Sequence, residues 1–541
     1  MIITLRSGCR NLRLPQIPWA SPYFKPTIKN TIALIARNLP SQTWRDAVTL
    51  CIGQLRFVEV VMLTIAGQRT GQFTGPGKSG QSSQNGVGRR GFLSVGSLAV
   101  GGLTLVDLLH ARLANAGEES GPRAGNPSDS SLGDAAGKGR SPKSVIFFFQ
   151  SGGASHLDMI DMKPHAVPEV RGPFTPIDTR LPGLSVCSLM PGHADIADKL
   201  AVIRSISHHL SVHDDATHWL QTGYPLLNAR QQGQQHPSQG SIVSALRGSN
   251  VPGMPPYVCI PEDYRKHMGF YEHAAFLSSR HNALDAGGDP SLGNYAAPSF
   301  SLPADVTMPR LENRRELHRS LDRLARRVEV SVEYAALDDV QRQALELTTG
   351  SAARQAFDLT QEPTDLRDAY GRHAYGQSAL LARRLVERGV SFVTINLYEK
   401  DIDWWDDHTT IEKNLRKRLP PYDQAVSTLI RDLEQRGQLD NVVVACFGEF
   451  GRGPRIDAGG GRSHWPGAMS AVLAGGGIRA GQIIGSTDST GSAPKDRPLA
   501  PGDLLASIYR VLGIDHESMI RNRQNRPIPI LASGKPIIEL F

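Results

Sequence analysis

The sequence predicts an α/β fold in which a mostly parallel central sheet has helices on both faces and carries a partly helical insertion. Four short apolar runs have the composition of strands buried on both faces, at residues 144–150, 390–397, 441–447 and 468–473. Amphipathic helical patterns lie between or after these runs, at residues 377–388, 411–435 and 501–512. Strands that alternate with helices are typical of a parallel sheet covered on both sides.

The connections agree with this order of elements. The first apolar run ends in Ser151, Gly152 and Gly153, which indicates a loop leaving the carboxyl end of a strand. Proline is favoured in the first turn of a helix, so we expect the last helix to begin at Pro501.

The middle of the chain, about residues 228–370, has a different character. Proline, glycine and histidine are scattered over residues 231–303, as in loops, whereas residues 311–350 form a charged amphipathic helical stretch. We interpret this part as an insertion or cap that is separate from the sheet of a domain covering residues 143–541.

The charge of the chain is unevenly distributed. Of its 541 residues, 40% are hydrophobic and 21% are charged, which is an ordinary globular composition. Residues 1–90 contain 12 Lys and Arg against 2 Asp and Glu, while the rest holds 47 basic and 50 acidic side chains. A nucleic-acid-binding protein should carry its basic residues on the folded domain, so we expect no nucleic-acid partner.

The basic N-terminal region, residues 1–116, has the features of a leader. Arg89 and Arg90 precede Gly-Phe-Leu and an apolar stretch at residues 94–109, and Ala114-Asn115-Ala116 follows as a small-x-small signal. This pattern predicts an export signal that resembles the twin-arginine type, with cleavage after Ala116. The expected destination, through the twin-arginine machinery, is the periplasm or cell envelope.

Two further features bear on this leader. An N-terminal membrane anchor is the alternative interpretation of the apolar stretch. Separately, 88 residues before the arginine pair is long for such a signal, so Met62 would be a more plausible start of the protein. Residues 117–142 are rich in Gly, Ser, Asp and Lys and predict a flexible linker. No later segment has 18 uninterrupted apolar residues, so we expect no transmembrane span after signal removal.

Histidines and carboxylates follow three of the predicted strands. The candidate ligands are His156, Asp158, Asp406, His408, Glu449 and His464. The carboxyl ends of parallel strands meet at one edge of a sheet, so these side chains should converge there. Clustered carboxylates repel one another unless a cation neutralises them, and mixed imidazole and carboxylate ligands suit Zn²⁺, Mn²⁺ or Fe. We therefore predict one or two divalent metal ions, with Zn, Mn or Ca possible.

A fourth polar cluster occupies residues 207–218. Asp214 or Asp215 can cap a short helix that opens here, which would place His213 at its positive end, where an anion can bind. Surface or capping roles remain the alternative for these histidines, including His208 and His218.

Several of these motifs together resemble a family of exported bacterial proteins of unknown function, the DUF1501 family. They lie at residues 152–158, 370–373, 376–378, 405–408, 448–455 and 461–465, and the resemblance covers about residues 143–541. The family is related in fold to the alkaline phosphatase and sulfatase superfamily. The resemblance implies an alkaline-phosphatase-like domain with a two-metal site that acts on phosphate or sulfate esters.

By the order of ligands in that superfamily, Asp158 or His156 matches the first ligand and His464 resembles the late histidine. Asp406 and His408 look like a middle pair, and Glu449 stands where an Asp-His pair is usual.

The chain also departs from the superfamily pattern. His213 falls at the nucleophile position, so the formylglycine route of sulfatases is not open to this chain. The sequence Glu449-Phe450 removes one expected histidine ligand, and Asp407 adds a second possible carboxylate.

These features leave three functions open. The first is hydrolysis of an anionic ester by metal-activated water or with His213 as ligand, acid/base or nucleophile, while Arg452 and Arg455 hold substrate oxygens. The two arginines can equally be ion-pair partners that brace the Glu449 loop. The second function is a catalytically degenerate surface protein that binds sulfated or phosphorylated glycans. The third is an envelope structural protein whose clusters are ion-pair networks.

Overall fold

The computed structural model describes residues 143–226, 233–260, 271–295, 297, 351–396 and 405–541. All of these residues belong to one compact unit, which lies within Pro127–Phe541. The predicted leader (1–116), the linker (117–142) and the helical stretch at 311–350 lie outside the described residues. No helix of the described part is long and apolar enough to cross a membrane.

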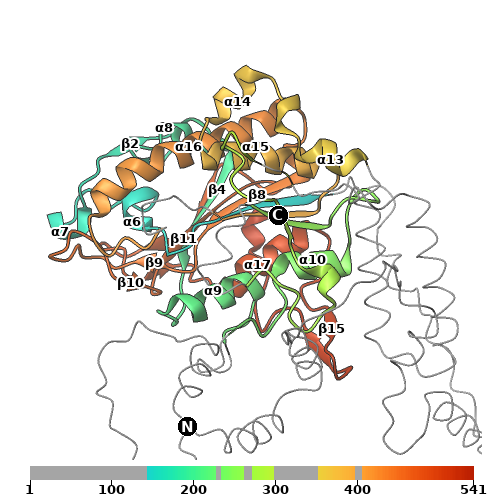
Figure 1. The fold of residues 1–541 in the computed structure, drawn as a ribbon. Coiled ribbons are helices and arrows are strands. Elements are labelled where there is room, and N and C mark those ends of the chain that lie inside the picture. Colours follow the sequence, from blue (N-terminus) through green and yellow to red (C-terminus); the bar gives the residue numbers. More distant parts are fainter. Residues whose placement is uncertain (1–142, 227–232, 261–270, 296, 298–350, 397–404) are drawn as a thin grey trace, which may run out of the picture. The chain divides into compact units, whose positions relative to one another are not determined.

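An eight-stranded sheet forms the centre of the domain (Figure 1). Its spatial order is β12 (Gln482–Ile484), β4 (Leu200–Ile206), β11 (Met469–Gly475), β8 (Val442–Phe447), β1 (Ser144–Phe149), β7 (Phe392–Asn396), β5 (Tyr257–Ile260) and β6 (Leu284–Asp285). Only β11 pairs antiparallel with its neighbours; the other pairings of this sheet are parallel. The predicted α/β class with a mostly parallel sheet is thus confirmed.

The four predicted strands are the four central ones, β11, β8, β1 and β7. Their apolar runs are continuous because both faces are covered. In β1, Ile146 and Phe148 belong to the core on one face, whereas Phe147 and Phe149 belong to the core on the other. All four side chains are buried.

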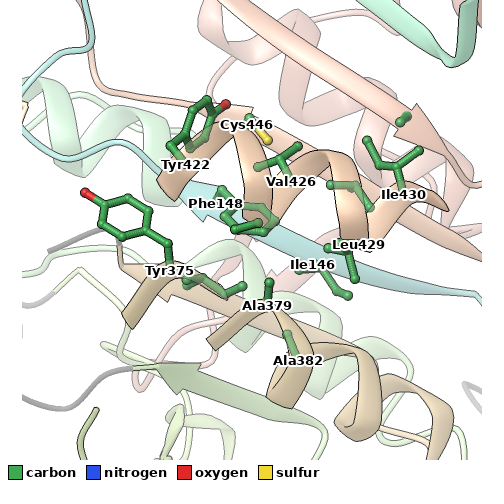
Figure 2. Packing of buried hydrophobic residues seen from close by; sticks show 14 of the residues in the cluster. Ile146, Phe148, Tyr375, Ala379, Ala382, Tyr422, Val426, Leu429, Ile430 and Cys446 are labelled. Carbon is green, nitrogen blue, oxygen red and sulfur yellow. The ribbon is translucent and has the colours of Figure 1, made fainter. Parts of the chain in front are cut away.

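Helices cover both faces of the sheet, as expected (Figure 1). On one face lie α15 (Ala374–Glu387) and α16 (Ile411–Gln435), with α6 (His156–Met159) and α8 (Pro191–Asp195). Figure 2 shows Ala379 of α15 and Val426 of α16 packed near Ile146 and Phe148. On the other face lie α9 (His213–Thr222), α10 (Gln239–Leu246) and α17 (Pro501–Val511). The three helices predicted from periodicity are α15, α16 and α17.

Shorter elements complete the described part of the chain. They are α7 (Pro168–Arg171), α13 (Ser351–Phe357), α14 (Thr364–Tyr370), β2 (Pro176–Asp178), β3 (Ser185–Cys187), β9 (Gly451–Arg452), β10 (His464–Trp465), β13 (Ser486–Thr487), β14 (Pro494–Asp496), β15 (Met519–Arg521) and β16 (Pro527–Pro529).

One expectation is wrong. The segment of about residues 228–370 was expected to be separate from the sheet, yet it supplies β5 and β6 to one side of the sheet. These strands are only four and two residues long, too short to stand out as apolar runs. The outer limits of an insertion in this region stay a prediction.

Candidate metal centre

Polar side chains gather at the edge of the sheet where β1 and β8 end. The turn after β8 carries Glu449, whose carboxylate accepts hydrogen bonds from the backbone N–H of Gly152 in the loop after β1. That turn continues into β9, which pairs with β10 so that Arg452 lies opposite His464. The N-terminus of α9 brings His213 to the same place.

Three of these side chains form a group that can hold a metal ion. Each of His213, Asp406 and His464 offers one ligand atom, and the three atoms lie within 4.8 Å of one another. Nε2 of His213 is 3.2 Å from one carboxylate oxygen of Asp406, and Nε2 of His464 is 3.1 Å from the other. All three side chains are partly exposed, although Nε2 of His213 is itself buried.

The second nitrogen of each histidine ring is occupied. Nδ1 of His213 lies 2.6 Å from Oε1 of Glu449, and Nδ1 of His464 lies 2.8 Å from the backbone oxygen of Ser211. A carboxylate or carbonyl oxygen only accepts hydrogen bonds, so each Nδ1 carries the proton. In the neutral rings both Nε2 atoms then carry the lone pair, as metal-binding histidines require.

His408 lies beside this group. Its Nε2 is 2.8 Å from Nε2 of His464 and 3.1 Å from Oδ1 of Asp406. The His408 side chain is 47% exposed, so it is the most accessible of the converging side chains. It can serve as a fourth ligand.

Glu449 contacts this group through the Nδ1 side of the His213 ring. Its side chain is fully buried, and it holds Nδ1 of His213 rather than joining the three ligand atoms. A ring nitrogen of His208 lies 2.8 Å from the backbone oxygen of Glu449 and fixes the turn. This arrangement of a carboxylate behind a histidine orients the ring and raises its basicity as a ligand.

Arg452 is a brace. Its buried guanidinium donates to the backbone oxygens of Gly153 (2.8 Å), Arg462 (3.0 Å) and Trp405 (3.2 Å), and it also forms an ion pair with Asp406. These bonds occupy its donors, which agrees with the bracing alternative rather than with substrate binding. Arg455 is exposed and forms no ion pair with Asp406 or Glu449 among the described residues.

Two predicted metal ligands lie elsewhere, and for them the expectation of convergence is wrong. Asp158 forms a buried ion pair with Arg462, at 2.7 and 3.1 Å, and neither side chain is exposed. His156 is also buried, and its Nε2 lies 2.8 Å from the backbone oxygen of Gly491. Both residues begin the short helix α6, capped by Ser155, and this helix directs their side chains into the protein interior.

Asp407, the possible second carboxylate, also points away from the group. It pairs with Arg418 at 2.7 Å and accepts a hydrogen bond from Asn414 at 2.9 Å, both on α16. Burial raises the pKa of Asp407 even though Arg418 acts in the opposite direction. This residue therefore anchors the loop between Asp406 and His408 to the helix.

The proximity of acids and imidazoles changes their protonation. Burial lowers the pKa of His213, but the carboxylates of Asp406 and Glu449 outweigh it and raise this pKa to about 9. Burial opposes ionisation of Asp406, but His213, His464 and Arg452 keep its pKa far below the usual range. Without a metal the group is an ion-pair cluster in which His213 is a cation at neutral pH.

The donor set fits a transition-metal ion. Tetrahedral Zn²⁺ with ligands at 2.0–2.1 Å separates its ligand atoms by about 3.3 Å, close to the separations among Asp406, His408 and His464. Nε2 of His213 is buried and, among the described residues, forms no hydrogen bond of acceptable geometry. Imidazoles with one carboxylate suit Zn²⁺ or Mn²⁺ better than Ca²⁺, which prefers oxygen ligands throughout. The described residues contain one such group.

Sequence reasoning missed two backbone contributions to this centre, the N–H of Gly152 and the carbonyl of Ser211. Every residue has a carbonyl group and every residue except proline has an N–H, so no side-chain pattern could have indicated them.

The family described as "Protein of unknown function (DUF1501)" matches residues 142–541 of the chain. No curated protein sequence matches it.

Similar solved structures share little sequence with it. A protein in the alkaline phosphatase superfamily from Vibrio parahaemolyticus is 10% identical, with 70% of this chain and 68% of that chain covered and a TM-score of 0.34. The lipoteichoic acid synthase LtaP from Listeria monocytogenes is 10% identical, with 69% and 72% covered and a TM-score of 0.33. The phosphonate monoester hydrolase SpPMH from Silicibacter pomeroyi is 10% identical, with 74% of each chain covered and a TM-score of 0.32.

Proposed function

The chain belongs to the DUF1501 family, and on that premise we propose that it is an exported, metal-dependent hydrolase of phosphate or sulfate esters. One observation carries the proposal: Nε2 of His213, Nε2 of His464 and the carboxylate of Asp406 converge, while each Nδ1 is tied to an acceptor. In the neutral histidines this arrangement turns both Nε2 atoms toward the Asp406 carboxylate, as a shared metal ion requires.

The metal would be held by His213, Asp406 and His464, with His408 as a further ligand. A divalent ion bound there supplies a Lewis acid and a water of lowered pKa. The protein's part is to fix the ligands: Glu449 orients His213, Ser211 orients His464, and Arg452 holds Asp406.

The charge of this site suits an anionic ester. A divalent cation and Arg452 together exceed the charges of Asp406 and Glu449 by one, so the loaded centre carries net positive charge. Asp214 and Asp215 in the first turn of α9 offset the positive end of that helix, so the positive charge comes from the ion and Arg452. These features support phosphate or sulfate esters as substrates.

The position of His213 favours a metal ligand over a covalent nucleophile. Its Nδ1 is held by Glu449 and its Nε2 faces Asp406. Both ring nitrogens therefore point toward a carboxylate, and neither is directed toward open solvent. Hydrolysis by a metal-activated water is therefore the form of the reaction that we propose.

A binding protein without turnover is the second candidate. It is favoured by His213, which by resemblance falls at the position where the superfamily carries a nucleophile. In that case the same centre would hold a metal and an anionic glycan, and the ester would stay intact.

Metal analysis of the purified full-length chain tests the proposal first. We expect about one equivalent of zinc or manganese in the wild type and much less in His464→Ala; absence of metal would favour the envelope structural protein. Hydrolysis of aryl phosphate and aryl sulfate by the metal-loaded wild type, and its loss in His213→Ala and His464→Ala, separates the hydrolase from the binding protein. Full occupancy without turnover on either ester would support binding.

Export is tested separately. Replacing Arg89 and Arg90 by lysine should retain the protein in the cytoplasm if the predicted twin-arginine signal is used. Unchanged appearance in the periplasm would contradict this part of the proposal.

A further inference from the structure

A tight turn over residues 457–462 directly precedes the strand that carries His464. The N–H of Asp457 donates to the backbone oxygen of Gly461 (2.9 Å), and the N–H of Gly460 donates back to that of Asp457 (3.0 Å). Oδ1 of Asp457 also accepts a hydrogen bond from the N–H of Gly459 at 2.9 Å. The turn is thus closed by its own backbone and by one aspartate side chain.

This turn is joined by backbone hydrogen bonds to the segment that carries Asp406 and His408. The N–H of Arg462 donates to the oxygen of Asp407 (2.9 Å), and the N–H groups of Thr410 and Ile411 donate to the oxygens of Gly459 (3.1 Å) and Gly460 (2.9 Å). Thr410 adopts a φ of 49°, in the left-handed region that non-glycine residues rarely occupy. The close fit of the two segments maintains this strained conformation.

Gly461 lies directly against the backbone of His408. A Cβ at position 461 would overlap the carbonyl carbon and oxygen of His408, and the N of Thr409. These are backbone atoms, so they cannot rotate away as the end of a flexible side chain can. A side chain at position 461 would therefore displace His408.

The His408 ring depends on this backbone placement. The side chain is 47% exposed, and its ring meets Asp406 and His464 rather than a surrounding core. Little packing is available to correct a shift of the His408 backbone. A small displacement of the chain would carry Nε2 of His408 away from Nε2 of His464.

We propose that Gly461 is a positioning residue, whose lack of a side chain lets the 457–462 turn hold His408 against Asp406 and His464. The proposal deepens the proposed function and rests on it, because it makes His408 a member of the metal centre. The turn then sets the distance between two ligand-bearing segments before any ion binds.

Co²⁺ titration of the full chain is the first test, read by visible absorption because the spectrum reports coordination number and geometry. We expect Gly461→Ala to weaken Co²⁺ binding about 10- to 100-fold and to change the spectrum in the same way as His408→Ala. Gly293→Ala, outside the turn, is the matched control: its φ is not positive, and the added Cβ would meet no atom within 4 Å. It should change the affinity by less than about threefold.

A double-mutant cycle decides whether Gly461 acts through His408. In the His408→Ala background, Gly461→Ala should cause less than about a twofold further loss of Co²⁺ affinity, because the positioned group is already missing. An undiminished loss in that background would overturn the proposal, since Gly461 would then act on the centre by another route.

A milder variant guards against misfolding of Gly461→Ala. Asp457 is exposed, so Asp457→Ala should fold while it loosens the turn. It should lower Co²⁺ affinity in the same direction, and again only when His408 is present; equal affinity to the wild type would count against the proposal.

A metal-free crystal structure separates failure of this inference from failure of the proposed function. If the wild type binds no Co²⁺, the metal-dependent hydrolase is wrong. The positioning role then still stands if Gly461→Ala or Asp457→Ala separates the two Nε2 atoms of His408 and His464, and it falls if these atoms stay in contact in both variants.

Discussion

Nδ1 of His213 lies 2.6 Å from Oε1 of Glu449, although the two residues are 236 positions apart in the sequence. The contact matters for the centre because, in the neutral ring, it places the proton on Nδ1 and leaves the lone pair on Nε2, which faces Asp406. Glu449 is in turn fixed by two hydrogen bonds from the N–H of Gly152. Glu449, which was expected to be a metal ligand, thus orients His213, one of the proposed ligands.

Glu449→Gln should weaken Zn²⁺ binding by about 10- to 100-fold, as is usual for partners that orient a ligand. The amide keeps the shape of the side chain but loses the charge, and its NH₂ group can meet the N–H of Gly152 as a second donor. Calorimetric titration of the metal-free protein measures the effect. Glu434→Gln is the control, because Glu434 is an exposed partner of Lys199 on the surface; an equal affinity of the wild type and Glu449→Gln would refute the orienting role.

Zn²⁺ binding should strengthen with pH. The pKa of His213 is raised to about 9, so a metal ion must displace a proton from this ring at any lower pH. The apparent affinity should rise about tenfold per pH unit from about pH 7 and level off above about pH 9. Titrations in buffers of different ionisation enthalpy count the released protons. A pH-independent affinity in this range would show that His213 releases no proton on binding, so it would be either no ligand or neutral in the metal-free protein.

The same raised pKa predicts the opposite trend for the stability of the metal-free protein. A group whose pKa is raised on folding stabilises fully below its unfolded value, here about 6.5, and loses that contribution as the pH rises through about 9. Metal-free wild type should therefore lose more thermal stability than His213→Gln between about pH 6 and pH 9.5. Parallel pH profiles of the two proteins would show that His213 is not charged in the folded state.

The central half of the sheet could be predicted from the sequence because its strands are buried on both faces. A short continuous apolar run such as Ile146–Phe149 that leads into Ser-Gly-Gly is typical of such a strand. The strand β4 was missed because Arg204 and Ser205 interrupt its apolar run, although it is seven residues long. Strands at the centre of the sheet can thus be recognised by their continuous apolar runs, whereas strands nearer its edges cannot.

The candidate site was predictable only as far as topology determines it. Strand order brings Asp406, Glu449 and His464 to one edge, and the sequence indicated that much. The direction of each side chain depends on partners far away in the chain, as with Asp158, which pairs with Arg462 at a separation of 304 residues. Such pairings leave no local pattern, so a buried ion pair and a metal ligand look alike in a single sequence.

Asp158→Asn should therefore reduce stability and not metal binding. The change leaves the Arg462 guanidinium buried without its counter-charge, which costs about 3–5 kcal/mol for fully buried pairs. Chemical denaturation should show this loss, while the folded variant retains about one equivalent of metal. Asp178→Asn, at an exposed position, should change the free energy of unfolding by no more than about 0.5 kcal/mol. Loss of metal from a folded Asp158→Asn protein would contradict this prediction and indicate that Asp158 is a metal ligand.

Gly152→Ala should lower both the free energy of unfolding and the Zn²⁺ affinity of the centre, although the left-handed backbone conformation of Gly152 accounts only for the first effect. Gly152 has a φ of 105°, and a Cβ there would lie 2.6 Å from the backbone N of Asp406 and 2.8 Å from the carbonyl carbon of Trp405. The matched control is Gly183→Ala, since Gly183 has a φ of 84° but no atom within 4 Å of a Cβ.

Both substitutions incur the cost of a left-handed alanine, about 1–2 kcal/mol, which should appear in the free energy of unfolding. Only Gly152→Ala should also push the Asp406 backbone away from Glu449 and lower Zn²⁺ affinity, by about tenfold or more, since a misplaced ligand is lost to the centre. The two variants are compared by denaturation and by Zn²⁺ titration of the folded proteins. Equal Zn²⁺ affinities would mean that the loop after β1 does not set the position of Asp406, and the coupling between Gly152, Glu449 and His213 would then be structural only.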